Sequence, residues 1–321
     1  MNHEDPLAVP LPEQLPGPVR VLAEELNAHL PLRQGDQRIV DPRFVIYLGA
    51  GADPHFTVVQ RLRLGPGELP QVVAEVRRLL AARGRRGATW ELGPSSQPAG
   101  LAAGLRALGM RPDPLESEVA GMVLARPPEP PNFAVAEGIT VERVESAAQL
   151  RRLGMRPDPR ESEVAGMVLL QPPELAVPDD IIVERVESAA RLHQVQVIFS
   201  GCFGTPLGDS DPQKDYARYQ ASPSWRSYIA LHDGQPIAAA DATFTDDAVV
   251  LSGGATLPAL RRRGAYQALI AARWRDAVAR GTPILVTQAG RMSRPILARL
   301  GFSVVAQVQI FLDEMRDPAP A

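Results

Sequence analysis

A segment of 17 residues occurs twice in this chain, almost unchanged. LGMRPDPLESEVAGMVL at 108–124 returns as LGMRPDPRESEVAGMVL at 153–169, with Leu115 replaced by Arg160. The copies recur with a period of 42 to 45 residues, which would fit a solenoid, but a solenoid needs at least about three repeats to bury a continuous core. Two copies therefore indicate a different architecture.

The repetition continues beyond this segment, because VERVESAAQL at 141–150 returns as VERVESAARL at 183–192. In all, 108–150 is repeated as 153–192. Each copy holds the last strand of one domain, a proline-rich linker and the first strand of the next. We interpret this as a segmental duplication that leaves one copy of each strand spare. A spare strand must pack elsewhere, loop out or exchange with a neighbouring molecule, so a homodimer through strand exchange is possible.

Strands alternate with helices on both sides of this junction, which predicts an α/β fold with a mixed sheet. The first half contains expected strands at 43–49, 55–64 and 88–93 and expected helices at 67–84 and 98–109. The second half contains expected strands at 181–186, 227–234, 235–246, 247–257, 282–290 and 303–313 and expected helices at 186–201, 263–281 and 293–301. We predict a first domain at 1–125, a junction at 126–180 and a second domain at 181–321.

The composition excludes several classes of protein. With 45% apolar and 22% charged residues the chain is ordinary for a globular protein, and its net charge of −3 argues against a nucleic-acid binder. The single cysteine, Cys202, has no disulfide partner, and no apolar run is long enough to span a membrane. His193 and His232 stand apart from other ligand types, so no metal site is expected. We expect a cytoplasmic protein.

Three arginines stand between an expected strand and an expected helix, in the segment LPALRRRGAY at 257–266. The N–H groups at a helix N-terminus bind anions, and Gly264 permits close approach of the backbone, so a diphosphate fits this turn. The patterns of the P-loop and of the Rossmann dinucleotide site are both absent. The alternative is that the arginines form a solvated face and that Gly264 belongs to an ordinary turn.

The surroundings of this turn resemble the GNAT superfamily of N-acetyltransferases over residues 181–321. The family motif, arginine or glutamine, two residues, glycine, one residue and glycine or alanine, aligns with Arg261–Tyr266, and Pro258 precedes it as in many relatives. Leu300, Gly301 and Phe302 resemble the closing Leu-Gly-Phe of the family. The order strand, turn, helix, strand, short helix and strand also agrees.

The resemblance implies tandem GNAT-like modules, each a mixed, mostly antiparallel sheet flanked by helices, and acetyl-CoA as co-substrate. It implies that the backbone of Arg262–Tyr266 holds the pyrophosphate and that the strand at Gly253–Leu257 pairs with the pantetheine arm. The implied cofactor-binding residues are Gly254, Ala255, Thr256, Leu257, Arg261, Arg262, Arg263, Gly264, Ala265 and Tyr266. The paired glycines Gly253 and Gly254 fit a bulged strand that a ligand approaches.

Several positions depart from the family pattern. Tyr266 replaces the last small residue of the motif, Leu297 stands where many relatives place the tyrosine that protonates the leaving thiolate, and Gly290 replaces a frequent asparagine. The remaining catalytic candidates are Tyr266, Ser293 and Asp241. Their structural alternatives are a helix-surface phenol, a helix cap and a strand-edge carboxylate respectively.

The acceptor is expected to be an amine, carried by a small molecule or a peptide. Trp225 and Tyr228 are candidates for its pocket or for the core, and the segment 199–224 would shape it. The leading interpretation is an acetyl-CoA-dependent N-acetyltransferase in which the amine attacks the thioester directly. The alternative is a weakly active or inactive GNAT-like protein that binds CoA or serves as a scaffold.

The first half follows the same late order of elements and is interpreted as a degenerate GNAT-like module. LGPGELPQ stands where the arginine-glycine turn should be, and it places Glu68 at the start of a helix. A carboxylate there interacts favourably with the helix dipole and repels a phosphate. We therefore expect no CoA site in this half.

Overall fold

The computed structural model describes residues 15–33, 35–49, 51, 53–114, 118–124, 167–169, 178, 180–203, 207 and 211–315. Most of the junction, including 141–150 and 153–166 of the repeat, lies outside the described residues. No helix of the described chain is long and apolar enough to cross a membrane.

The expected strands and helices are present in both halves. The strands of the first half are β1 (Gln37–Val40), β2 (Val45–Leu48), β3 (Thr57–Gln60), β4 (Gly87–Leu92), β5 (Arg111–Pro112) and β6 (Glu118–Leu124). Its helices are α1 (Gly17–Glu24), α2 (Leu26–His29), α3 (Leu69–Ala81) and α4 (Leu101–Ala107), with a 3₁₀ turn η1 (Pro54–Phe56). The later strands are β7 (Met167–Leu169), β8 (Ile181–Arg185), β9 (Trp225–His232), β10 (Gln235–Phe244), β11 (Val249–Thr256), β12 (Leu285–Ala289) and β13 (Phe302–Glu314). The later helices are α6 (Ala189–Phe203), α7 (Pro212–Gln220), α8 (Ala265–Ala279) and α9 (Arg294–Arg299), with a 3₁₀ turn η2 (Pro258–Leu260). The sequence did not predict β1 or α7.

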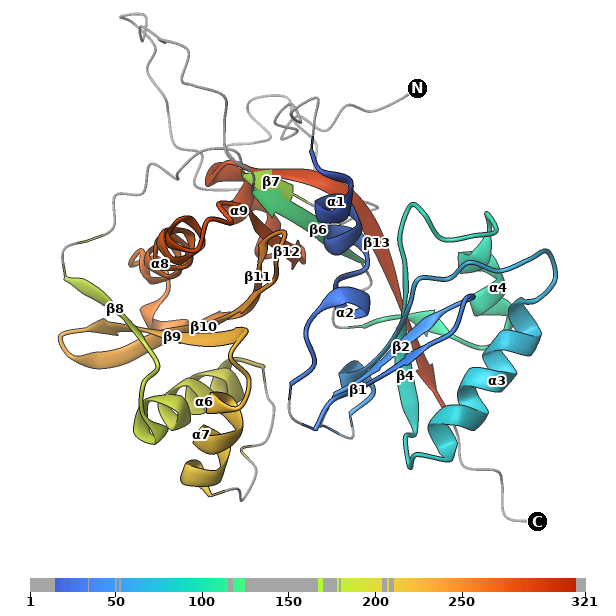
Figure 1. Cartoon of the computed structure of the whole chain (residues 1–321), viewed down its shortest axis with the longest axis horizontal. Helices are drawn as coiled ribbons and strands as arrows, with labels where there is room; N and C mark the ends of the chain where they lie inside the picture. The colour runs from blue at the N-terminus through green and yellow to red at the C-terminus, as the bar shows by residue number, and fades with distance from the viewer. Residues whose placement is uncertain are drawn as a thin grey trace, which may run out of the picture.

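The strands form one sheet that runs through both halves (Figure 1). Its order is β1-β2-β3-β4-β13-β6-β12-β11-β10-β9-β8. Among the described strands only β3 with β4 and β11 with β12 pair in parallel. This confirms an α/β fold of two mixed, mostly antiparallel modules flanked by helices.

The two modules exchange strands within the chain. β6 precedes the junction in the sequence, yet it lies between the second-module strands β12 and β13. β13 is long enough to serve both modules, because Ser303–Gln309 pairs with β6 and Gln309–Glu314 pairs with β4. The exchange is thus satisfied inside one chain, and exchange between chains stays a prediction. The domain boundaries also stay predictions, because the sheet is continuous.

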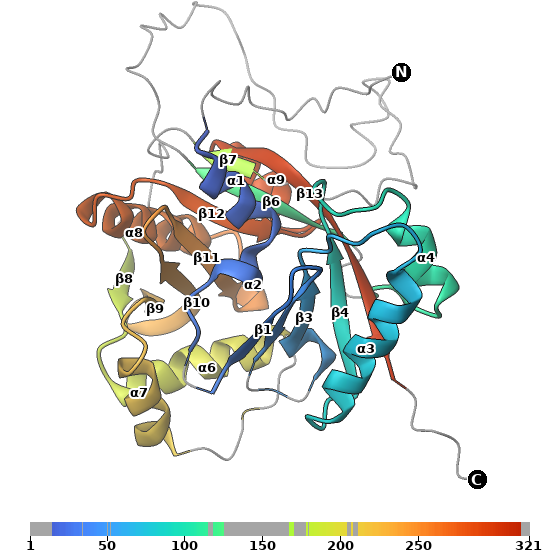
Figure 2. The same cartoon turned by 45° about the vertical axis from the view of Figure 1, so that its right-hand side comes forward.

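The second copy of the repeated strand lies against the first. β7 pairs with β13 in the register that β6 uses, so that Val304 is opposite Met122 in one pairing and opposite Met167 in the other. β7 lies beside β6 in both views (Figures 1 and 2). The two copies therefore present equivalent residues to the same partner.

Small residues bring the sheet and its helices close together in the second module. Alternation along β10 directs Ala240 and Ala242 toward α8 and directs Ala239 toward α6. Alanines of α8 pack on the first face, and Leu192, Val195 and Ile198 of α6 pack on the other. Asp241 follows the alternation of Ala239, so its side chain belongs to the α6 face.

A helix of the first module covers strands of the second. Val19, Leu22 and Ala23 of α1 pack on Val123 of β6 and Val286 of β12. This apolar contact adds a second connection between the modules, and α1 lies over the junction of the two halves (Figure 2).

A buried carboxyl group lies on β4. Burial raises the pKa of Glu91 to about 7, although hydrogen bonds with Gln60 and Gln288 oppose the change. In the folded protein Glu91 therefore titrates near neutral pH, whereas in the unfolded chain it titrates near the ordinary value of 4.5.

The first prediction concerns the duplicated strand. Met122 is fully buried, so Met122→Asp should cost about 2–5 kcal/mol or more if no other residue could replace it. Because Met167 faces Val304 in the same register, we expect the second copy to take over and reduce the loss to about half or less. Met122→Asp combined with Met167→Asp should unfold the protein, as measured by urea denaturation. Val286→Asp is the control. Val286 is fully buried on the neighbouring strand β12, which has no second copy, so this substitution should show the whole loss of stability. If the single variant is as unstable as the double variant, the copies are not interchangeable.

The second prediction concerns Glu91. A raised carboxyl pKa stabilises the fold below the ordinary value, and this contribution is lost as the pH rises through about 7. Glu91→Gln should remove that loss and make the protein more stable than the parent at pH 8, by roughly 2–3 kcal/mol. Urea unfolding at pH 5 and pH 8 measures the difference, with the exposed Glu187→Gln as control. Equal pH dependence in the parent and Glu91→Gln would show that Glu91 does not titrate in this range.

Candidate active site

Strand β11 carries a bulge at its two glycines. Ala239 of β10 pairs with Ala255, and Asp241 pairs with Ser252, so β11 has one extra residue between these pairs. Gly253 has a φ of +60°, a backbone conformation that side chains rarely adopt. The glycines that the sequence singled out therefore form a bulge.

Two aromatic rings pack against this bulge, one from α6 and one from α8. A Cβ on Gly253 would lie 3.0 Å from Cζ of Phe199, which comes from α6. A Cβ on Gly254 would lie 2.7 Å from Cε2 of Tyr266, which comes from α8. Any side chain at Gly254 would displace the tyrosine ring, so packing favours glycine at this position.

β11 and β12 diverge beyond their first residues. They pair only at Val249 with Leu285 and at Val250 with Val286, and the Thr287 hydroxyl donates to the carbonyl of Leu251 at 3.0 Å. Further along, β12 remains paired with β6 and β11 remains paired with β10. The backbone of β11 beyond Ser252 therefore has one free edge within the described chain, and an extended ligand could pair with it.

The arginine-glycine turn connects this edge to α8. Arg262 and Gly264 both have positive φ, +65° and +84°, and α8 has no side-chain cap at its N-terminus. Within the described chain, none of the backbone N–H groups of residues 262–267 donates a backbone hydrogen bond. These donors at a helix N-terminus suit a diphosphate, while the side chains of Arg261–Arg263 are exposed around them.

A proline lies against the same turn. A Cβ on Gly264 would lie 2.8 Å from both Cγ and Cδ of Pro178, which precedes β8. Only glycine therefore fits between the proline and the turn. Pro178 therefore forms one wall of this turn.

A buried arginine lies on the α8 face of the sheet. Arg273 is 1% exposed, and its Nη1 donates to the carbonyl of Asp241 at 3.1 Å, while Nη2 has no partner among the described residues. Burial lowers the pKa of Arg273. Burial also raises the pKa of Tyr266, although the positive charge of Arg273 acts to lower it. Arg273 lies among the buried residues of α8. A charged residue on the apolar face of an expected helix is a signal that the sequence could have provided.

Asp241 lies on the opposite face of the sheet, in a cavity of about 760 Å³ between the modules. It is 6% exposed and accepts a hydrogen bond from Oγ of Ser227 at 2.6 Å. Burial raises the pKa of Asp241, and the nearby charge of Arg33 and the Ser227 hydrogen bond oppose this. The alternative of a strand-edge carboxylate is wrong, because Asp241 is buried and its strand is paired on both sides, with Ser227 of β9 and with Ser252 of β11.

The aromatic candidates divide between the cavity and the core. Trp225 lines the cavity, whereas Tyr228 is 1% exposed on the α8 face and donates to Oδ2 of Asp276 at 2.5 Å. Cys202 is partly buried, and burial raises its pKa. Among the described residues no cluster of three or more metal-binding side chains occurs.

The remaining candidates lie on α9. Ser293 is at the N-cap position, but its hydroxyl donates to the carbonyl of Gly290 at 3.3 Å and does not cap the helix. Leu297 is 1% exposed in the core. Asp241 lines the cavity between the modules, whereas Ser293 does not.

The corresponding turn of the first module is filled by its own carboxylate. Oε2 of Glu68 accepts a hydrogen bond from the N–H of Gly65 at 2.6 Å, just before α3. This contact places a negative charge where a phosphate would have to bind.

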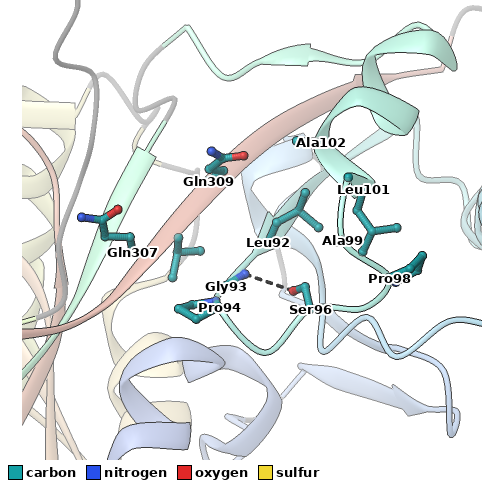
Figure 3. A pocket seen from close by; sticks show the side chains of 12 residues that line it. Leu92, Gly93, Pro94, Ser96, Pro98, Ala99, Leu101, Ala102, Gln307 and Gln309 are labelled. Atoms are coloured by element: carbon teal, nitrogen blue, oxygen red, sulfur yellow. Dashed lines mark hydrogen bonds between the residues drawn. The ribbon is translucent and has the colours of Figure 1, made fainter. Parts of the chain in front are cut away.

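A smaller cavity of about 320 Å³ lies beside β4 and α4 (Figure 3). Gln307 and Gln309 of β13 line it together with the loop Leu92–Ser96 and the start of α4, and Oγ of Ser96 accepts from the N–H of Gly93 at 3.1 Å. Its lining contains amides, a hydroxyl and apolar groups but no ionisable side chain. It therefore offers hydrogen bonds without acid-base chemistry.

No protein-family model matches the chain, and no curated protein matches it in sequence. Solved structures match it over nearly its whole length. A GCN5-related N-acetyltransferase from Kribbella flavida is 19% identical with a TM-score of 0.58, covering 93% of this chain and 96% of its own. A GCN5-related N-acetyltransferase from Sphaerobacter thermophilus is 12% identical with a TM-score of 0.54, covering 88% of this chain and 84% of its own.

A tandem GNAT protein from the clavulanic acid biosynthesis pathway is 15% identical with a TM-score of 0.50, covering 94% of this chain and 89% of its own. These similarities extend through both halves and across the shared sheet. The chain therefore has the fold of the GNAT N-acetyltransferases, with two modules in tandem.

Proposed function

We propose that the protein is an acetyl-CoA-dependent N-acetyltransferase whose working site lies in the second module. The observation that carries this proposal is the sequence of three features along the chain: the bulge of β11, its free edge and the uncapped turn before α8. Together they offer an extended edge followed by an anion cradle, which matches an extended arm that ends in a diphosphate.

The residues that would hold acetyl-CoA follow from this arrangement. The N–H groups of Arg262–Tyr266 would hold the diphosphate, with Arg261 beside them, and the edge of Gly254–Leu257 would pair with the pantetheine arm. Bound acetyl-CoA would supply an activated acyl thioester. In the first module Glu68 fills the equivalent turn, and we propose that this module binds no CoA.

Asp241 is the proposed base for the acceptor amine. An ammonium group must lose a proton before it can attack, and a carboxylate with a raised pKa accepts that proton more readily than an ordinary aspartate. Asp241 is opposite Ser252, next to the bulge, so an amine in the cavity would lie near the edge of β11. Ser227 orients the carboxylate.

Tyr266 is the proposed proton donor for the leaving group. Its ring lies against Gly254, and burial keeps the phenol protonated at neutral pH. Arg273, held by the carbonyl of Asp241, provides a fixed positive charge on the same face. In this assignment Tyr266 would take the role of the family tyrosine, whose position is occupied by Leu297 in this chain.

The second candidate is a CoA-binding protein with little or no turnover. Leu297, buried in the core, favours it because an apolar side chain supplies no proton to a leaving group. Turnover of an amine decides between the two. We place either function in the cytoplasm on the sequence argument alone.

The test of the cofactor site is the unfolding temperature with and without acetyl-CoA. A ligand at 100 times its dissociation constant adds about 2.7 kcal/mol to the folded state and should raise the midpoint by several degrees. Gly264→Glu should abolish this rise, because it adds a carboxylate to the cradle.

Gly100→Glu is the matched control. Gly100 is also an uncapped helix N-cap with positive φ, +88°, but it lies in the first module. Both variants should lose stability without ligand, and only Gly264→Glu should lose the response to acetyl-CoA. No response in the parent protein, or an equal response in Gly264→Glu, would refute the proposed site.

The test of the base is Asp241→Asn. Because burial raises the pKa of Asp241, the protonated carboxyl stabilises the fold at low pH and this contribution is lost as the pH rises. The amide removes the buried charge, so the variant should be more stable than the parent at pH 8. Its acetylation rate should fall by roughly two to four decades.

The exposed Asp246→Asn is the control for both measurements, which are urea unfolding and steady-state kinetics. An unchanged rate in Asp241→Asn would show that Asp241 is not the base.

A further inference from the structure

The Asp241 cavity is built by both modules. The first module contributes Arg33, Tyr47 and Phe56, and the second contributes Phe199, Trp225 and Asp241 among its lining residues. Its volume of about 760 Å³ is within the range of sites for small-molecule ligands. The degenerate module is therefore a wall of this cavity.

Most charged groups of the cavity already have partners. Asp36 accepts hydrogen bonds from the Tyr47 hydroxyl at 2.5 Å and from the N–H of Arg33 at 3.2 Å. Asp215 accepts from Nε2 of Gln196 at 3.1 Å and from Nη1 of Arg218 at 3.3 Å. Neither carboxylate needs a ligand to balance it.

Arg33 is different. Its guanidinium lies 3.9 Å from the centre of the Trp225 ring, a cation-π contact that uses only its face. Within the described chain, the side chain of Arg33 makes no ion pair or hydrogen bond. The N–H donors along the edge of the guanidinium therefore lack acceptors, and they form a fork that matches a carboxylate.

Arg33 and Asp241 thus present opposite charges to the same cavity. They make no salt bridge within 4.0 Å in the described structure, yet they are close enough for Arg33 to affect the titration of Asp241. Two opposite, separated charges in one cavity are complementary to a molecule that carries both signs. The rings of Tyr47, Phe56 and Phe199 add apolar surface around them.

We propose that the acceptor is an α-amino acid with a large apolar side chain, whose amine lies at Asp241 and whose carboxylate binds Arg33. The proposal rests on the proposed function for the use of the amine, but the binding that it describes does not require acetyl-CoA. Arg33 is then the residue of the first module that determines specificity, and it selects amines that bear an adjacent anion.

The experiment compares L-phenylalanine, L-tryptophan and L-leucine with their amides by calorimetry on the intact protein without acetyl-CoA. Each amide keeps the amine and the side chain but lacks the anion. A charge-assisted contact should make at least one amino acid bind about ten-fold or more tightly than its amide. In Arg33→Ala this preference should disappear because only the amino acid binds more weakly, and Arg33→Lys should restore part of it.

Arg218→Ala is the control, since it removes an arginine that lines the same cavity but pairs with Asp215. Unfolding temperatures of all variants check that they fold. The proposal is overturned if the amides bind as well as the amino acids, if no amino acid binds, or if Arg218→Ala and not Arg33→Ala removes the preference. It is also overturned if Arg33→Ala weakens both ligands equally.

Kinetics with acetyl-CoA give a second measurement. Arg33→Ala should raise KM for the amino acid with little change in kcat, because the residue holds the ligand and takes no part in proton transfer. A failure of acetyl-CoA to bind would refute the proposed function, whereas a missing amino-acid preference would refute only the identity of the acceptor.

Discussion

The hydrogen-bond ladder of β13 is the interaction on which the rest of the structure depends. Its first part pairs with β6 and its last part pairs with β4, so one strand lies in the interior of both modules. Oδ1 and Oδ2 of Asp313, near the end of β13, accept hydrogen bonds from Arg77 of α3 at 2.8 and 3.0 Å. Separating the modules would leave this ladder and a buried carboxylate unpaired, and each buried polar group left unpaired costs about 1–3 kcal/mol. The modules therefore hold a fixed relation, and a cavity between them can have a defined shape.

The two modules differ at the turn that precedes their long helix. Gly264 and Glu68 both precede a helix that starts without a side-chain cap. At Gly264 the N–H groups remain free for a ligand, whereas at Glu68 the carboxylate turns back onto Gly65. In the proposed function, Glu68 would make an internal contact where the second module binds a phosphate. The first module contributes Arg33, Tyr47 and Phe56 to the shared cavity instead.

Sequence reasoning reached the local features and missed those that depend on tertiary contacts. The helix periodicity of α8 and the bulge glycines follow from residue type and spacing, and both are present. Ser293 stands at the expected end of α9, but its hydroxyl does not cap the helix. The insertion of β6 between β12 and β13 could not be predicted, because strand register depends on partners far away in the sequence. Arg33 gave no sequence signal, since its role arises only where the first module meets Trp225. The helix α7 is polar and short, so periodicity gave little indication of it.

The bulge of β11 places two kinds of chemistry on opposite faces of one strand pair. Asp241 projects toward α6 while its own carbonyl accepts from Arg273, which approaches from α8. Burial raises the pKa of Asp241 and the pKa of Tyr266, which makes the carboxylate a better base and keeps the phenol protonated. Acyl transfer to an amine needs a proton removed on the acceptor side and a proton delivered on the leaving-group side. In the proposed function, the carboxylate of Asp241 would meet the first need and the phenol of Tyr266 the second, from opposite faces of the bulged strand.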